Sequence, residues 1–466
     1  MCQENRKVQK MKDAVSLDMT EGNSMRHILL FALPLFIGTL FQQAYNLVDT
    51  MIAGHSLGND AVAAIGSTSA LYSVVVYFAG GLNSGYGILI SRLFGAKDWK
   101  RLKQAVAVMV VLDMLVTVVL TAVILPVLRP VLYLLDTPQD IFVQAHEYIF
   151  VIFAGMIMTI CYNMCAGFLR AIGNSRVPLY FLILSCCLNV GMDVLFMVVL
   201  KMGVVGAALA TVIAEAVSAF ACMLYIYRKY REFLPGRDDW KLPKELVREM
   251  FVTGLSMAMM QSVFALGSII LQKAINNLGT GLITAHTASR RVYELLMMPM
   301  STIGTANATF VSQNFGAGKI KRITDTLKKV MWIELAWSVF SLVVSVLLGR
   351  EIVRLLLGTG NEDILSNAVL NLNVSTLFFF PLGMLLVMRM SMQSMGYKVA
   401  PVISSSIELV VKIVASWWVI PRLGYISVVA TEPLIWVLCM IFLSCVYRAT
   451  YRKRLGIDRV GQGKSI

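Results

Sequence analysis

Apolar residues run along most of this chain in stretches of 20 or more, separated by short polar segments. A helix of that length crosses a hydrocarbon core of about 30 Å. The pattern therefore predicts an all-α, polytopic membrane protein with twelve transmembrane helices. We expect these at residues 26–53, 61–91, 103–127, 140–168, 177–200, 204–227, 246–275, 281–311, 325–348, 364–394, 399–420 and 425–447.

The two halves of the chain resemble each other. Residues 91–97 read Ser-Arg-Leu-Phe-Gly-Ala-Lys, and residues 312–318, which lie 221 positions later, read Ser-Gln-Asn-Phe-Gly-Ala-Gly. The acids Asp113 and Glu334, inside predicted spans, are also 221 positions apart. Because each half has an even number of spans, both halves insert in the same orientation, so we expect two parallel six-helix repeats around a central site.

A single long polar linker near the midpoint separates the two repeats. We expect a cytoplasmic N-terminal segment at 1–25, an N-lobe at 26–227, a cytoplasmic linker at 228–245, a C-lobe at 246–447 and a basic cytoplasmic tail at 448–466. The first segment is charged and lacks an apolar core, so no cleaved signal peptide is expected.

Composition and charge agree with a membrane protein. The chain is 58% hydrophobic and 15% charged, against about 45–50% and about 25% in soluble proteins, which excludes a soluble enzyme or a disordered scaffold. The net charge of +14 comes from 41 Lys and Arg, of which 31 lie in the predicted inside segments and six in or beside outside loops. Basic residues collect on the cytoplasmic side of membrane proteins. We therefore expect both termini in the cytoplasm, a place in the plasma (inner) membrane and no nucleic-acid partner.

The sequence carries no recognisable nucleotide site. Gly316-Ala-Gly318-Lys319 resembles the end of a phosphate-binding loop, but Ile320 follows where that loop requires Ser or Thr. We expect no enzymatic activity and no organic cofactor, so any coupling of transport must come from an ion gradient.

Ionisable residues within spans are costly, at least about 2.5–3.5 kcal/mol each, and normally face a cavity or a partner. Two pairs in the C-half, Arg290 with Glu294 and Glu408 with Lys412, are four residues apart and are expected to pair along a helix. The N-half carries Asp49, Asp113, Asp193 and Glu215 within its spans, and the C-half carries Arg290, Arg291, Glu294, Glu334, Glu408, Lys412 and Glu432.

The N-half acids are different, because no basic residue lies in the predicted membrane core of that half. Each must hold a proton, bind a cation or interact with charge from the other half. Asn189 and Asp193 share a helix face, and Thr211 is expected at a similar depth on the next, antiparallel helix. A carboxylate, an amide oxygen and a hydroxyl suit Na+ or a proton, although polar contacts that hold helices together are an alternative interpretation.

Four segments, two of which contain the repeated Phe-Gly-Ala motif, make the chain resemble the multidrug and toxic compound extrusion (MATE) transporters. They are Pro34 with Asn46-Leu-Val-Asp49-Thr-Met-Ile-Ala-Gly54, Phe94-Gly-Ala96, Arg170-Ala-Ile-Gly173-Asn174 and Gln313-Asn-Phe-Gly-Ala-Gly318-Lys319 with Arg322. The resemblance covers roughly residues 20–450. It implies two six-helix bundles in a V and the export of organic, often cationic, compounds in exchange for H+ or Na+.

Within that family the chain is more similar to DinF-type than to NorM-type members. The resemblance implies that Asp49, Asn189, Asp193 and Thr211 form the cation-coupling site, with Na+ as one possible ion. NorM-type members carry an acid in span seven and an Asp in span ten, where this chain has Gln261 and Arg389, so ion coupling in the C-lobe by that route is not expected. A C-lobe site built from Glu408 and Glu432 stays open, because Glu432 is the repeat counterpart of Thr211 and Lys412 that of Asn189. The residues expected to line a substrate cavity are Asp113, Glu215, Gln261, Arg290, Glu294, Glu334, Glu408 and Glu432.

We therefore expect a secondary active efflux transporter that acts as a monomer in the lipid bilayer on small cationic or amphiphilic organic compounds. The alternative is a flippase for lipid-linked or polysaccharide precursors from the same superfamily. Twelve spans and an N-half core without basic residues favour small-molecule export. The sequence names neither the substrate nor the coupling ion.

Overall fold

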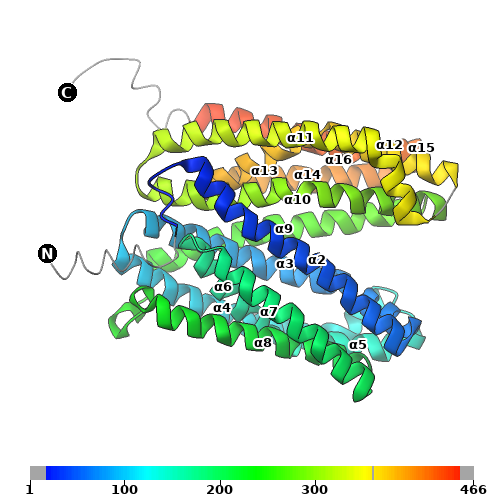
Figure 1. Cartoon of the computed structure of the whole chain (residues 1–466), viewed down its shortest axis with the longest axis horizontal. Helices are drawn as coiled ribbons and strands as arrows, with labels where there is room; N and C mark the ends of the chain where they lie inside the picture. Colours follow the sequence, from blue (N-terminus) through cyan, green and yellow to red (C-terminus); the bar gives the residue numbers. More distant parts are fainter. Residues whose placement is uncertain (1–16, 359–360, 452–466) are drawn as a thin grey trace. The chain divides into compact units, whose positions relative to one another are not determined.

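The computed structural model describes residues 17–358 and 361–451, and twelve helical spans follow one another along them (Figure 1). The spans of the first half are α2 (Ser24–Leu57), α3 (Asn59–Gly95), α4 (Trp99–Leu134), the pair α5 (Gln139–Ala154) and α6 (Met156–Ala171), α7 (Arg176–Asp193) with the π-helical turn η1 (Val194–Val199), and α8 (Gly203–Lys229). Those of the second half are α9 (Lys244–Asn276), α10 (Thr280–Gly316), α11 (Ile320–Leu357), the pair α12 (Glu362–Leu377) and α13 (Phe379–Ser394), α14 (Val399–Val414) with the π-helical turn η4 (Ala415–Val419) and the short α15 (Ile420–Leu423), and α16 (Tyr425–Val446). Short turns η2 (Arg231–Phe233) and η3 (Arg237–Trp240) connect α8 to α9, and η5 (Tyr447–Tyr451) follows α16. The predicted all-α fold is confirmed.

Eleven of these twelve spans are apolar enough to cross a membrane by their own composition. Within the described ranges, nine single helices meet that condition, and the two bent pairs bring the number to eleven. The twelfth, α10, is 37 residues long but contains Arg290, Arg291 and Glu294. It therefore needs its helical neighbours to stabilise it in a bilayer.

The chain forms two compact units. Among the described residues, the first unit, here called the N-unit, comprises residues 17–21 and 33–258, and the second, the C-unit, comprises residues 22–32, 259–358 and 361–451. Helices α2 and α9 thus each contribute to both units. The lobe boundaries expected from the sequence stay a prediction.

Equivalent turns recur in the two halves at the spacing of the sequence repeat. Residues with positive φ form five pairs separated by 221 to 223 positions: Gly58 and Gly279, Lys97 and Gly318, Asp136 and Gly358, Gly173 and Gly396, and Gly203 and Gly424. Lys97 and Gly318 end the repeated Phe-Gly-Ala motif, where the chain leaves one helix and enters the next through the left-handed region. The motif that first indicated the repeat is therefore a helix-terminating turn.

The fourth span of each half is bent, which the sequence pattern does not predict. The axes of α5 and α6 differ by 46° around Gly155, and those of α12 and α13 by 50° around Phe378. At Gly155 a Cβ atom would lie 2.4 Å from Cγ2 of Val212 on α8. The bend therefore brings the backbone against α8 at a position where only glycine fits.

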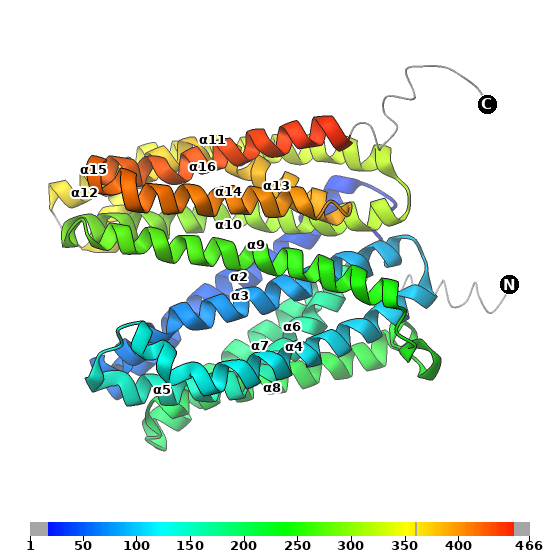
Figure 2. The ribbon, with the colours of Figure 1, turned by 180° about the vertical axis from the view of Figure 1, so that it is seen from behind.

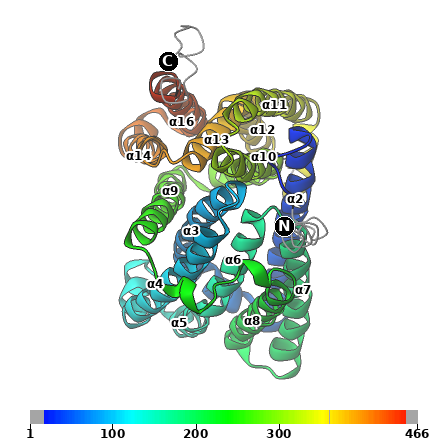
Figure 3. The same cartoon turned by 90° about the vertical axis from the view of Figure 1, so that its left-hand side faces the viewer.

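Each unit has its own apolar core. In the N-unit, α7 and α6 pack along α8 (Figures 1 and 3), and Tyr86, Phe168 and Leu169 are buried at the centre. In the C-unit, α14 lies beside α16 (Figure 2), and α10 packs against α12 and α13 around Phe379. The outer faces carry large exposed apolar side chains such as Leu355, as expected for a surface in contact with lipid.

Gly85 is predicted to be essential for packing inside the N-unit. A Cβ atom at this position on α3 would lie 2.5 Å from Cα of Gly254 on α9. Gly85→Ala should therefore lower the free energy of unfolding by about 1–3 kcal/mol, as overpacking does in other cores. Gly80→Ala, where nothing lies within 4 Å, is the control and should be neutral or stabilising because alanine favours the helix. Thermal unfolding in detergent checks both, and equal midpoints for the two variants would contradict the packing argument.

Candidate functional site

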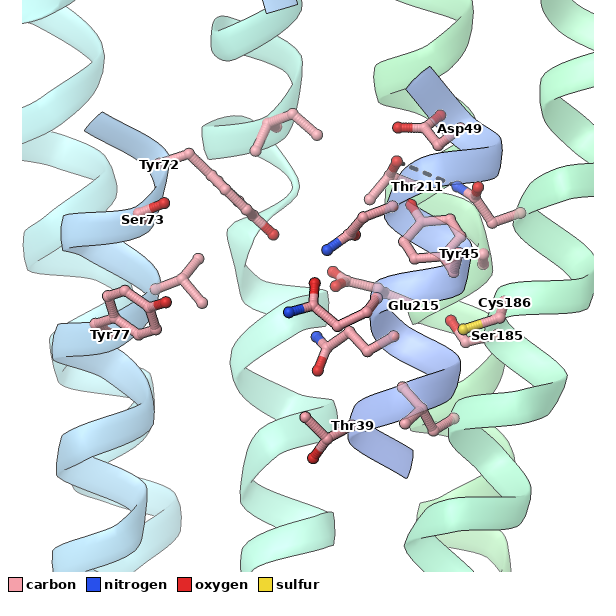
Figure 4. A pocket seen from close by; sticks show the side chains of 18 of the residues that line it. Thr39, Tyr45, Asp49, Tyr72, Ser73, Tyr77, Ser185, Cys186, Thr211 and Glu215 are labelled. Atoms are coloured by element: carbon pink, nitrogen blue, oxygen red, sulfur yellow. Dashed lines mark hydrogen bonds between the residues drawn. The ribbon is translucent and has the colours of Figure 1, made fainter. Parts of the chain in front are cut away.

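A polar cavity of about 430 Å³ lies inside the N-unit, between α2, α3, α5, α7 and α8 (Figure 4). Its size falls within the range of small-molecule sites, about 300–1,000 Å³. Asp49 and Glu215 are its two acidic residues, and no Lys or Arg is among the described residues that line it. The lining comprises Thr39, Gln42, Gln43, Tyr45, Asn46, Asp49, Tyr72, Ser73, Val76, Tyr77, Tyr148, Ile152, Leu182, Ser185, Cys186, Asn189, Thr211, Ala214 and Glu215.

The four residues expected to bind a cation come together, but only Asp49, Asn189 and Thr211 line this cavity, and Asp193 contacts Asn189 from outside the lining. Asn189 and Asp193 lie one turn apart on α7, and both are almost completely buried. Thr211 faces them from α8. In the orientation of the Asn189 amide that satisfies both neighbours, its nitrogen donates to Asp193 Oδ2 at 2.7 Å. Its oxygen accepts from the hydroxyl of Thr211 at 3.1 Å and from the backbone N–H of Thr211 at 3.0 Å.

Asp49 completes this group from α2. Its carboxyl group lies within interaction range of that of Asp193, and Figure 4 shows it above Thr211. The Oδ1 atoms of both acids are buried and have no hydrogen-bond partner. Two neighbouring carboxylates repel each other when both are charged, so the pair fits a shared proton or a bound cation.

The backbone changes its winding directly after Asp193. Residues 194–199 form the π-helical turn η1, in which the N–H of Leu200 bonds to the carbonyl of Leu195 at 2.8 Å. Such turns are rare and are frequent at functional sites. The wider turn accommodates one more residue per bond than an α-helix, and it begins where the site ends.

Tyrosines and a second acid surround the carboxyl pair. Glu215 accepts a hydrogen bond from the hydroxyl of Thr159. Tyr148 lies near enough to interact electrostatically with both aspartates and with Glu215, and Tyr72 likewise faces Glu215. The sequence analysis missed these tyrosines, although one signal was present. Tyr72 has a counterpart 221 positions later, Tyr293.

Two further buried acids lie outside the cavity lining. Asp113 on α4 is 2% exposed and accepts a hydrogen bond from Nδ2 of Asn83 at 3.2 Å. Glu334, its repeat counterpart on α11, is fully buried, and neither of its carboxyl oxygens has a hydrogen-bond partner. A Cβ atom added at Gly383 would lie 2.7 Å from Glu334 Oε2, so the glycine leaves room for the side chain.

In the C-unit, both ion pairs expected from sequence spacing are present. Arg290 Nε lies 2.7 Å from Glu294 Oε1, and Lys412 Nζ lies 3.1 Å from Glu408 Oε1. The sequence did not predict that Arg389 also reaches Glu408, at 3.5 Å. Glu408 is therefore held between two cations, which offsets part of the cost of burying it.

The remaining expected residues lie on other helices of the C-unit. Glu432 on α16 accepts a hydrogen bond from the hydroxyl of Tyr293 at 2.8 Å. Gln261 is half-buried on α9. Of the eight residues expected in a substrate cavity, Glu215 lines the N-unit cavity, and as substrate contacts all eight stay a prediction.

Among residues 17–358 and 361–451, no group of three or more His, Cys, Asp and Glu is arranged to hold a metal ion. The candidate site consists instead of two carboxyl groups, one amide and one hydroxyl. This donor set suits a proton or a weakly held alkali cation.

Comparison with known proteins agrees with the repeat and the fold. The MatE family model matches twice, at residues 34–195 and 256–418, once in each half. The probable multidrug resistance protein YoeA of Bacillus subtilis is 29% identical over 316 residues, which cover 66% of this chain and 68% of that protein. The multidrug export protein MepA of Staphylococcus haemolyticus is 22% identical over 96% of this chain and 98% of that protein.

The fold also matches a solved structure of the outward-facing conformation of a multidrug resistance MATE family transporter of the MOP superfamily. The TM-score is 0.86 at 20% identity, and the match covers 95% of this chain and 98% of the other. Since the family model covers most of the chain and accounts for both repeats, this protein is a member of the MATE family of membrane transporters.

Proposed function

We propose that this protein exports cationic or amphiphilic organic compounds from the cell and takes up protons in exchange. The observation that carries the proposal is the pair Asp49 and Asp193, each with a buried, unpartnered oxygen, beside a cavity without a basic lining residue. The relatives described as multidrug resistance and multidrug export proteins support the direction and the class of cargo.

The orientation of Asn189 supports a proton rather than Na+ as the coupling ion. In the orientation that satisfies both neighbours, its NH2 group faces Asp193, and an N–H donor repels a cation placed on the same carboxyl group. A proton shared by Asp49 and Asp193 needs no further oxygen ligand. Binding of Na+ through the Asn189 oxygen would use the opposite orientation, in which the two hydrogen bonds from Thr211 to that oxygen are replaced by one from the Asn189 nitrogen to the Thr211 hydroxyl, at 3.1 Å.

The carboxyl groups couple the export of substrate to the uptake of protons through their charge. When they are ionised, they attract a cationic substrate into the cavity. When a proton neutralises them, that attraction is lost and the substrate leaves on the outside. Coupling requires the proton and the substrate to stabilise different conformations, because a ligand with equal affinity for both shifts nothing.

The cavity lining supports an aromatic or amphiphilic cation as substrate. Tyr45, Tyr72, Tyr77 and Tyr148 present rings, and amide side chains such as Gln42 add hydrogen-bonding groups. Cations bind to aromatic faces with about 0.5–2 kcal/mol each. The combination favours an organic cation over a small inorganic one.

Asp193→Asn is predicted to abolish proton-driven export. The protein is reconstituted in liposomes with a fluorescent cationic dye, and a pH gradient or a Na+ gradient is imposed separately. Wild type should move dye under the pH gradient, and the variant should fall to the level of protein-free liposomes because an amide cannot exchange the proton. Asp60→Asn, an exposed acid in the first turn of α3, is the matched control and should transport normally.

Three outcomes would contradict the proposal. Normal export by Asp193→Asn would exclude this site from coupling. Dye movement by wild type under the Na+ gradient alone would replace the proton by Na+. No dye movement under either gradient, with a labelled lipid-linked precursor moved instead, would favour the flippase.

Thr211→Val is predicted to slow export without abolishing it. The substitution removes one of two hydrogen bonds to the Asn189 oxygen, and the backbone N–H of residue 211 keeps the other. A lost hydrogen bond of about 1 kcal/mol corresponds to about a five-fold lower rate. Thr211→Ser retains the hydroxyl and should restore the rate in the same liposome assay. Equal rates for the valine and serine variants would show that the hydroxyl is not used.

A further inference from the structure

The C-unit repeats the framework of the N-unit site, but a lysine stands where the N-unit has an asparagine. Lys412 lies 223 positions after Asn189, and Glu432 lies 221 positions after Thr211. Tyr293, which donates to Glu432, occupies the repeat position of Tyr72.

The unusual backbone of the site is repeated as well. In the N-unit the π-helical turn η1 begins at residue 194, five positions after Asn189, and in the C-unit η4 begins at residue 415, three positions after Lys412. Such turns are rare, so their recurrence at equivalent places indicates that the two sites are the same structural feature.

Lys412 is buried at this position, where it has two partners and a space that fits its side chain. Its side chain is 2% exposed, and Nζ lies 3.1 Å from Glu408 Oε1 and 4.9 Å from the centre of the Phe264 ring. A Cβ atom at Gly267 would lie 2.8 Å from Cδ of Lys412, so the glycine on α9 leaves the space that the lysine stem fills. Burial of an ammonium group is costly unless it is paired, and here a carboxylate and an aromatic face provide the partners.

The two carboxylates beside Lys412 are accordingly satisfied. Glu408 contacts Lys412 and Arg389. Glu432 accepts from Tyr293 and interacts electrostatically with Lys412, Arg290 and His286. In the described part of the chain, no buried oxygen of Glu408 or Glu432 lacks a hydrogen-bond partner, whereas Asp49 and Asp193 each have one that does.

We infer that the ammonium group of Lys412 is a built-in cation, which permanently occupies in the C-unit the position that an exchangeable cation takes in the N-unit. The C-unit site formed by Glu408 and Glu432 then binds no coupling ion, and of the two equivalent sites the transporter exchanges ions only at that of the N-unit. The inference rests on the proposed coupling role of the N-unit site and adds to it that the equivalent C-unit site is not used.

The test removes the lysine and asks whether a free cation replaces it. The full-length chain is purified in detergent with the substitution Asp193→Asn, which removes one of the two carboxyl groups of the N-unit site. Thermal unfolding is then measured as Na+ replaces choline at constant ionic strength, and again between pH 8 and pH 6. A second substitution, Lys412→Asn, introduces the residue type that the N-unit has at the equivalent position. It leaves Glu408 and Glu432 free to take up Na+ or a proton. The midpoint of this double variant should rise by several degrees with Na+ or with acid.

Two controls separate this effect from general salt and charge effects. Asp193→Asn alone should show no dependence on Na+, because Lys412 already neutralises Glu408 and Glu432. Its response to pH is the baseline for the double variant, because Asp49, Asp113 and Glu334 can still take up protons in both. Asp193→Asn with Lys412→Arg keeps a cation at the position and should behave in the same way. A folded Lys412→Asn variant whose midpoint changes no more than that of Asp193→Asn alone would overturn the inference.

A measurement with Lys412 intact covers the case in which the double variant does not fold. Stabilisation of Asp193→Asn by Na+ at constant ionic strength, relative to choline, would mean that an ion binds elsewhere in the chain and would overturn the inference. Absence of that stabilisation supports it. Export by Asp193→Asn would instead overturn the proposed function, so the two failures are distinguishable.

Discussion

A carboxyl group inside a membrane protein must be neutralised, and this requirement organises both units. The cost of an isolated charge in low dielectric is several kcal/mol, so each buried acid needs a proton, a mobile cation or a fixed one. The N-unit places Asp49 on the lining of a cavity and Asp193 next to Asp49, and each acid keeps one buried oxygen without a hydrogen-bond partner. The C-unit places Glu408 between Lys412 and Arg389, where side chains of the protein perform the same task.

The two units thus share a backbone and differ in their chemistry. Left-handed turns, a bent fourth span and a π-helical turn recur at spacings of about 221 to 223 residues. These features depend on backbone geometry and on a few glycines. The residue at one helix position is asparagine in one half and lysine in the other. Its charge can differ between the halves without disturbing these backbone features. A duplicated fold can therefore keep its backbone geometry while equivalent positions in its two halves carry different charges.

Much of the fold could be predicted from the sequence because long apolar stretches and a repeated motif leave few alternatives. The pair Glu408 with Lys412 followed from helical spacing alone, and Thr211 was expected near Asn189 because of its similar depth on the next, antiparallel helix. The bend at Gly155 could not be predicted, because it depends on the approach of Val212 from another helix. Arg389 was missed for the same reason, since its partner Glu408 lies on a different helix. Helical periodicity predicts contacts along one helix, whereas contacts between helices require the packing.

Helix α10 has a consequence for how the chain enters the membrane. It contains Arg290, Arg291 and Glu294, and each charge at the centre of a helix opposes partition from the translocation channel into lipid. Its partners include Glu432, which Tyr293 contacts from α10 and which is synthesised about 140 residues later. During synthesis α10 must therefore remain beside the insertion machinery or in a helical hairpin with α9 or α11. Biogenesis of the second half is then expected to be a concerted event rather than a succession of independent helix insertions.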